Sequence, residues 1–402
     1  MIRGWRAALL LAAVTCLAGC KGFWDAPGTS SAGGCTTNCT TATSGAFYIL
    51  NVGTTPQIVG QAITSGALAS ISGSPWALLA TPYAMAMSHN GAFLYVSTSL
   101  GVSVYPVNNG VLGAAATVSQ DQALALRVDT TGNWLIEALQ STPTVTMAAI
   151  PLNSSTGNPS SVELTATYTL TNNANPNAIA NAAVQPGEIA ISPDDVNIFV
   201  ALGTGGVIVV PFNAGAAAGV SPFGAQPNLI PAANSAGAAL SVAVDPGGHL
   251  FYIGQTLVNS SANSGGLFVY NYSSLSAATL TQATGSPIAS GGLAPNAILP
   301  LPTGSYVYVA NGQGTNTAGT INSFSISSSG SAYTIAAAGS VATGQQPIGL
   351  AEDSSDTFIL AVNAYGNPYF SSYTFDATTA GKLDPQIVAN TGATPIAIVA
   401  AP

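Results

Sequence analysis

Short apolar segments alternate with turn residues along most of the chain, in a pattern that occurs in six complete copies. Each copy has an apolar strand, a tight turn, and a second strand rich in aromatic and β-branched residues. The copies span residues 83–97, 124–138, 188–201, 240–254, 296–311 and 348–362. Gly, Asp, Asn and Ser in the turns adopt the backbone conformations that join paired strands. The pattern predicts a series of β-hairpins over residues 46–402.

A third strand with alternating polarity follows five of the copies. These third strands are expected at 102–107, 207–212, 267–272, 321–326 and 369–375. Shorter stretches rich in Thr, Ala and Val then fit a fourth, outermost strand. Each repeat is therefore predicted to form a four-stranded antiparallel sheet.

The seventh repeat is divided between the two ends of the repeat region. Residues 47–51 resemble a second strand without a first, and residues 395–399 resemble a first strand without a second. Pairing the two would complete one sheet and remove an open edge. We therefore predict an all-β fold: a seven-bladed β-propeller of four-stranded blades, closed by the N- and C-terminal strands in one blade. A pair of β-sandwiches or a β-helix is the competing architecture.

The first 20 residues have the features of an export signal. Arg3 and Arg6 precede a short apolar stretch at 7–14, and the segment ends in Leu17-Ala18-Gly19-Cys20. This ending resembles the bacterial lipobox, which implies that residues 1–19 are removed and that Cys20 is lipidated. An ordinary signal peptide with a chance cysteine is the alternative. Residues 20–45 are rich in Gly, Ser and Thr without a hydrophobic period, so they are expected to form a flexible tether.

Export has consequences for location and for the other cysteines. Lys21 follows the lipidated residue in place of the Asp that retains many lipoproteins in the inner membrane, so the outer membrane is the favoured site in the cell envelope. An oxidising compartment would allow a Cys35–Cys39 disulfide, with two unpaired thiols as the alternative. No histidine or third cysteine lies near them, so no metal site is expected there.

Ionisable residues are scarce, and this excludes several classes of function. The chain has five Lys and Arg residues against 14 Asp and Glu residues, and charged residues make up 5% of it. Signal cleavage would leave Lys21, Arg127 and Lys382 as the basic residues. So few cations cannot neutralise a run of phosphates, which argues against nucleic-acid binding. Membrane association is expected through the lipid alone, with the protein as a monomer.

The repeats resemble those of the YVTN-type and lactonase-type seven-bladed propellers, notably at 189–194 and 306–311. That resemblance implies hydrolysis or formation of sugar or organic-acid lactones such as 6-phosphogluconolactone. It also implies a site where each outer strand leads into the next innermost strand, with His and Arg just after a Pro. The corresponding pairs are 82–83, 122–123, 187–188, 238–239, 295–296, 347–348 and 395–396. None of these residues is His or Arg, which argues against a phosphorylated substrate.

The remaining polar side chains give a small set of candidates. Glu188 and Arg127 are the candidate catalytic residues, and Tyr83, Gln122 and Asn296 are candidate binding residues on the same face. His89 and His249 are expected to be solvated turn residues on the opposite face. The residue spacing contains no metal-ligand cluster, and no cofactor is expected.

Two functional hypotheses remain. The first is a surface binding or scaffold module that recognises a saccharide or an envelope protein through neutral polar and aromatic groups. The alternative is a carbohydrate-lactone hydrolase with an atypical site built on Glu188, Arg127 and Tyr83. Propeller folds host many functions, so the fold does not choose between them.

Overall fold

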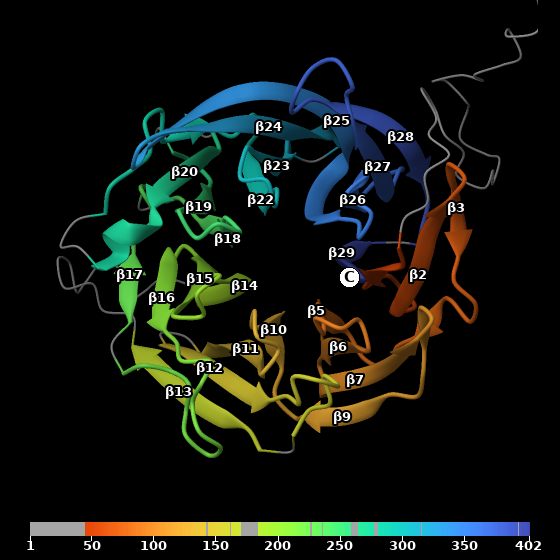
Figure 1. Cartoon of the computed structure of the whole chain (residues 1–402). Helices are drawn as coiled ribbons and strands as arrows, with labels where there is room; N and C mark the ends of the chain where they lie inside the picture. Colours follow the sequence, from red (N-terminus) through yellow and green to blue (C-terminus); the bar gives the residue numbers. More distant parts are fainter. Residues whose placement is uncertain are drawn as a thin grey trace, which may run out of the picture.

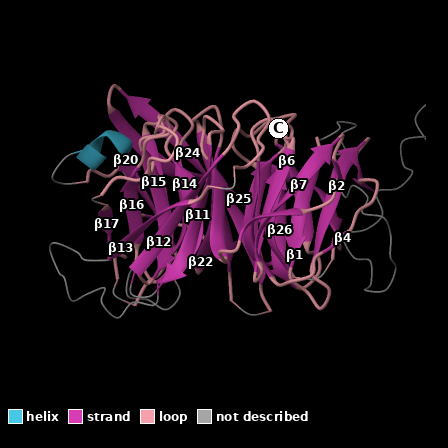
Figure 2. Ribbon diagram, turned by 90° about the horizontal axis from the view of Figure 1, so that it is seen from below, coloured by secondary structure: helices cyan, strands magenta, loops and turns pink. Residues whose placement is uncertain are grey.

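The strands are arranged around a central axis, as Figure 1 shows in the computed structural model. The structure describes residues 45–402, apart from 142–143, 161, 170–183, 226, 235, 259–263, 277–279, 315 and 393. The export signal, Cys20 and the Cys35–Cys39 pair lie outside the described residues. Seen from the side in Figure 2, the strands run between two loop-bearing faces. Within the described residues, no helix is long and apolar enough to cross a membrane.

Seven antiparallel blades form the ring, which confirms the predicted fold class. Blades 1 to 3, each from the innermost strand outward, are β29 (Pro395–Ala400), β1 (Phe47–Asn51), β2 (Gln57–Thr64) and β3 (Ala67–Ser70); β5 (Pro82–Met87), β6 (Phe93–Thr98), β7 (Gly101–Asn108) and β9 (Ala116–Ser119); and β10 (Ala123–Val128), β11 (Trp134–Ser141), β12 (Thr144–Pro151) and β13 (Leu164–Thr169). Short strands β4 (Trp76–Ala77) and β8 (Val111–Leu112) pair with β2 and β7.

Blades 4 to 7 follow the same order. They are β14 (Val184–Ile191), β15 (Asn197–Gly203), β16 (Val207–Pro211) and β17 (Asn228–Ile230); β18 (Ala239–Val244), β19 (Leu250–Gln255), β20 (Gly266–Asn271) and β21 (Ile288–Ala289), with the 3-10 helix η1 (Tyr272–Ser276) after β20; β22 (Ala294–Pro300), β23 (Tyr306–Gly312), β24 (Ala318–Ser329) and the first part of β25 (Ala332–Glu352); and the last part of β25, β26 (Phe358–Tyr365), β27 (Phe370–Phe375) and β28 (Leu383–Ala389). Strand β25 thus passes unbroken from the edge of blade 6 to the centre of blade 7.

Blade 1 closes the ring as the divided repeat predicted. Strand β1 pairs with β29 on one side and with β2 on the other, so both ends of the propeller share one sheet. The interface between blades 7 and 1 is apolar, and Phe47 stacks on Phe370 with ring centroids 5.2 Å apart. Ile398 of β29 is buried in the same cluster. The last strand therefore contributes backbone pairing and core packing to the closure.

The turn after the innermost strand contains a buried acceptor in five blades. The backbone N–H five residues further on donates to this side chain, which is Asp129, Asp245 or Asp353 in three blades and Ser88 or Ser192 in two. Blade 6 has buried Leu301 at the equivalent position; its N–H donates to the Tyr306 carbonyl oxygen, a backbone hydrogen bond that the other five turns also make. The Asp and Ser residues of the repeat therefore order the turn, as small polar residues commonly do.

Replacing Asp245 by alanine is expected to lower the free energy of unfolding by about 2–3 kcal/mol, because buried amide donors lose their acceptor. Asp245 accepts hydrogen bonds from the N–H groups of Gly247, His249 and Leu250. Urea denaturation would measure the change. Asp245→Asn keeps one acceptor oxygen and should cost less, so equal stability of wild type and Asp245→Ala would contradict this role.

Candidate functional site

A β-bulge begins the innermost strand of every blade, on the face opposite the acceptor turns. In six blades the innermost strand has one residue more than its partner, and β14 has two more. Bulges commonly occur beside functional sites, where they redirect a side chain. The residues at this position are Tyr83, Leu124, Gly187, Leu240, Asn296, Ile348 and Ile396. The residue pairs named from the sequence contain the bulge residue in five blades, and they end one residue before it in blades 3 and 5.

These seven residues, called the bulge ring below, are partly or fully exposed, whereas the preceding residue of each strand is buried. The bulge thus turns one residue per blade out of the packed core. Tyr83 and Asn296 are the polar side chains of the ring, and Leu124, Leu240, Ile348 and Ile396 are aliphatic. The ring contains no His or Arg, as expected from the sequence. It presents an uncharged surface.

Two candidate binding residues also connect neighbouring blades. The Gln122 amide donates to the Ser99 carbonyl oxygen at 3.1 Å, and the Asn296 amide donates to the Pro347 carbonyl oxygen at 2.7 Å. Each bond joins the start of one blade to the blade beside it. Gln122 is exposed while Tyr83 and Asn296 are half-buried, so these side chains remain accessible on this face. Their part in ligand binding stays a prediction.

Glu188 lies in β14 directly after the bulge and is half-buried. Its Oε2 accepts a hydrogen bond from the Val242 N–H of the next blade at 3.1 Å. Burial raises the pKa of Glu188 to about 7, while the Val242 hydrogen bond and the Arg127 charge act in the opposite direction. The carboxyl group can therefore hold or release a proton near neutral pH.

Arg127 lies in β10, the innermost strand of the blade beside that of Glu188. It is exposed, although Leu126 and Val128 on either side are buried. Its charge lowers the pKa of the Glu188 carboxyl group, although no salt bridge joins the two side chains among the described residues. Their joint part in catalysis stays a prediction.

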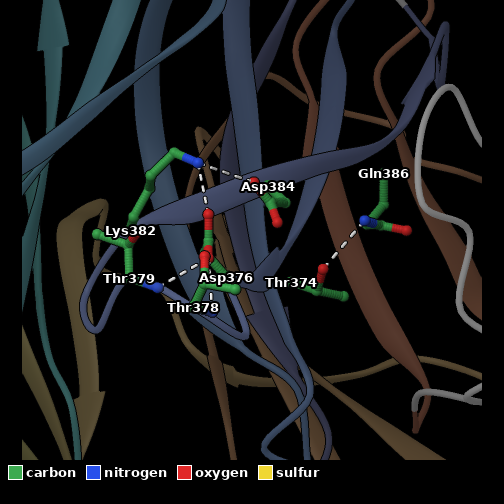
Figure 3. Close-up of polar contacts among 7 residues, drawn as sticks. All are labelled: Thr374, Asp376, Thr378, Thr379, Lys382, Asp384 and Gln386. Atoms are coloured by element: carbon green, nitrogen blue, oxygen red, sulfur yellow. Dashed lines mark hydrogen bonds and ion pairs between the residues drawn. The ribbon is translucent and has the colours of Figure 1, made fainter.

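The other described basic residue, Lys382, is held on the outside of blade 7. Figure 3 shows its ammonium group between Asp376 and Asp384 at the turn that joins β27 and β28. The ion pair raises the pKa of Lys382, and hydrogen bonds from Lys382 and Thr378 hold the pKa of Asp376 below its usual range. Among the described residues, Arg127 is therefore the one Lys or Arg side chain outside a salt bridge.

Sequence reasoning did not find a cavity on the acceptor-turn face. This cavity of about 310 Å³ is lined by His89, Glu352, Asp353, Asp356 and residues 400–402, among others. Burial raises the pKa of Glu352 to about 7, and the charges of Asp356 and Asp353 raise it further. A His89 ring nitrogen is hydrogen-bonded to the Asp129 carbonyl oxygen, and both His89 and His249 are exposed, as expected of turn residues. The lining is acidic, which does not suit an anionic ligand.

Solved structures with the same architecture carry lactonase names. The chain matches a candidate 6-phosphogluconolactonase from Bacteroides fragilis at 15% identity with a TM-score of 0.64, over 90% of this chain and 98% of that one. It also matches the periplasmic gluconolactonase of Pseudomonas aeruginosa at 15% identity with a TM-score of 0.60, over 90% and 100%. The fold is similar to that of 6-phosphogluconolactonase-like propellers. No family model and no curated protein matches the sequence.

This likeness extends over the whole ring and agrees with the resemblance found in the sequence. A second candidate 6-phosphogluconolactonase, from Bacteroides uniformis, gives 17% identity and a TM-score of 0.62 over 89% of this chain and 99% of that one. At such identities the comparison concerns the fold. The chemistry must be argued from the side chains of this chain.

Proposed function

We propose that the protein hydrolyses an unphosphorylated lactone of a sugar acid at the bulge face, with Glu188 as general base and Arg127 as oxyanion partner. The observation that carries the proposal is a carboxyl group of pKa about 7 under the influence of an exposed guanidinium group. A general base acts best when its pKa lies near the working pH. The lactonase names of proteins with a similar fold support the same reaction class.

The proposed reaction needs one water molecule and no further reactant. The Glu188 carboxylate removes a proton from water as the oxygen attacks the lactone carbonyl carbon. The Arg127 guanidinium group stabilises the oxyanion of the tetrahedral intermediate. The intermediate then collapses, the ring C–O bond breaks, and Glu188 returns the proton to the departing alkoxide. The product is the open hydroxy acid, and Glu188 is again a carboxylate.

The charges of the site indicate the substrate class. A phosphorylated sugar would require cations for its phosphate group as well as for the oxyanion. Arg127 is the described basic side chain that could serve, since Lys382 is paired on blade 7. The uncharged bulge ring suits hydroxyl groups through Tyr83 and Asn296. A neutral sugar lactone therefore fits better than its phosphate ester.

Acid release from glucono-1,5-lactone at constant pH would test the proposal, with the spontaneous rate as reference and the 6-phosphorylated lactone for comparison. We expect enzymatic turnover of the unphosphorylated compound and little of the phosphorylated one. Hydrolysis at the spontaneous rate across a panel of sugar lactones would contradict the proposal.

A binding or scaffold role is the second candidate, and one observation favours it. The amides of Gln122 and Asn296 already bridge blades, which holds the uncharged bulge ring in a fixed arrangement suited to a saccharide or an envelope protein. In this case lactones would not be turned over, and binding to a glycan or to an envelope protein would survive Glu188→Gln. Co-purification from cross-linked envelopes would identify such a partner.

We also propose that the protein is exported and anchored to a membrane, preferably the outer one, through a lipid on Cys20. Cys20→Ala should move nearly all of the protein from the membrane to the soluble fraction, because buried acyl CH₂ groups contribute about 0.8 kcal/mol each. Cys16→Ala is the matched control, since Cys16 lies in the segment expected to be removed. Fractionation with labelled palmitate would measure this, and membrane retention of Cys20→Ala would contradict it.

A further inference from the structure

Three carboxylate side chains meet where blade 2 leads into blade 3. Asp121 lies in the connection from β9 to β10, Glu137 in β11, and Glu163 just before β13. One oxygen from each lies within 4.8 Å of the others. We call these residues the carboxylate trio. Asp121 and Glu163 lie 16 and 26 positions from Glu137 in the sequence and converge with it only because the strands pair, so no ligand spacing could be detected.

Glu137 is the member of the trio that indicates a missing partner. Its side chain is fully buried, and neither carboxylate oxygen has a hydrogen-bond partner in the described structure. Buried polar groups are almost always paired, and an unpaired buried carboxylate is costly. Strands β10 and β12 flank Glu137 with Leu126 and Ala148, which provide no side-chain donor. The position therefore needs a positive partner that the protein itself does not supply.

The side chains nearest to Glu137 do not meet this need. Glu163 and Asp121 both act on Glu137 with negative charge, and ionised carboxylates only accept hydrogen bonds. Both oxygens of Glu137 therefore stay without a donor in the described structure. A cation among the three would contact all of them at once.

We propose that Asp121, Glu137 and Glu163 form a calcium site that ties the connection between blades 2 and 3 to the body of blade 3. All the ligand atoms are oxygen, which suits a hard cation rather than zinc or copper. Calcium–oxygen distances of about 2.3–2.6 Å allow two ligands of one ion to lie up to about 5 Å apart, so the three ligand atoms are close enough together to share one ion after small side-chain shifts.

Calcium is favoured over magnesium because calcium accepts irregular and bidentate carboxylate geometry, whereas Mg²⁺ requires a near-ideal octahedron. Glu137 has both oxygens available for bidentate coordination. The Ser119 hydroxyl supports the other two ligands, since it accepts a hydrogen bond from the Asp121 N–H at 2.9 Å and bonds to Glu163. Second-shell contacts of this kind orient metal ligands. The trio includes neither Glu188 nor Arg127, so this proposal does not depend on the proposed hydrolysis.

Calorimetric titration of CaCl₂ into chelator-treated full-length protein tests the proposal. We expect one Ca²⁺ per chain, weaker binding of Mg²⁺, and a rise of about 2 °C or more in the thermal midpoint at saturating calcium. Losing an outer-shell partner of a metal ion typically lowers the metal affinity 10- to 100-fold. Glu137→Gln removes a direct ligand, so it should weaken calcium binding by more than that. Asp121→Asn and Glu163→Gln change half-buried residues, so they test the ligand set even if Glu137→Gln does not fold.

Glu352→Gln is the control, because Glu352 also has a raised pKa beside two carboxylates but lies on the acceptor-turn face. It should bind calcium as the wild type does. Absence of calcium binding by the wild type would overturn the proposal, as would full calcium affinity in the three trio variants. Magnesium affinity equal to that of calcium would overturn the choice of ion.

Discussion

Glu188→Gln is expected to reduce the turnover of a neutral sugar lactone by about 10²- to 10⁴-fold, the usual contribution of a positioned general base. Glutamine keeps an oxygen that can accept the Val242 N–H hydrogen bond, so the blade contact survives while the base is lost. Arg127→Ala should lower kcat by about 10²- to 10³-fold through loss of the oxyanion partner. Steady-state assays of acid release would measure both effects.

The pH dependence provides an independent check of the same residue. Because burial raises the pKa of Glu188 to about 7, the carboxylate that acts as base forms only as the pH rises through that value. The observed kcat/KM should increase tenfold per pH unit below about pH 7 and level off above it. Glu188→Gln should abolish this rise. A flat profile in the wild type would argue against Glu188 as the base.

Glu352→Gln is the matched control for these experiments. Glu352 has a similar pKa of about 7 but lines the cavity on the acceptor-turn face. Its replacement should leave both the rate and the pH profile unchanged. If Glu352→Gln removed activity and Glu188→Gln did not, the reaction would belong to the other face of the ring.

The strands and the ring closure could be predicted because their signals are local. Each signal covers only a few residues. These signals are the alternating third strands, turn residues such as Asp245 and Asp353, and the two half-repeats at 47–51 and 395–399. The position of the bulge was missed by one residue in blades 3 and 5. Innermost strands are buried on both faces and read as continuous apolar runs, so no alternation fixes their register.

The site was predictable only in part, for a related reason. Glu188 and Arg127 were recognisable because charged residues are rare in the innermost strands, so each stood out from its apolar neighbours. The carboxylate trio had no such signal. Glu137 occupies one position in a strand that otherwise fits the repeat, and its partners reach it from two connections, before β10 and before β13. Contacts across strand pairs are not encoded in residue spacing.

Ending the chain at Thr394 is expected to remove most of the stability of the propeller. This truncation deletes β29, so β1 loses the partner on its inner side and Ile398 leaves the cluster that contains Phe47 and Phe370. Loss of one buried aliphatic side chain costs about 2–5 kcal/mol, and a whole domain is stabilised by only about 5–15 kcal/mol. The open blade would also expose an unpaired strand edge, which favours aggregation.

A circular permutant separates the effect of closure from that of lost residues. Placing residues 395–402 and a short linker before residue 46, and ending at Thr394, supplies the same strand from the other end of the chain. Blade 1 becomes continuous, and the hydrogen bond from the Ala401 N–H to the Ala46 carbonyl oxygen shows that the two segments already lie together. Denaturation should then recover a cooperative transition near that of the wild-type ring. A truncated chain as stable as the permutant would mean that pairing of β29 with β1 does not hold the ring closed.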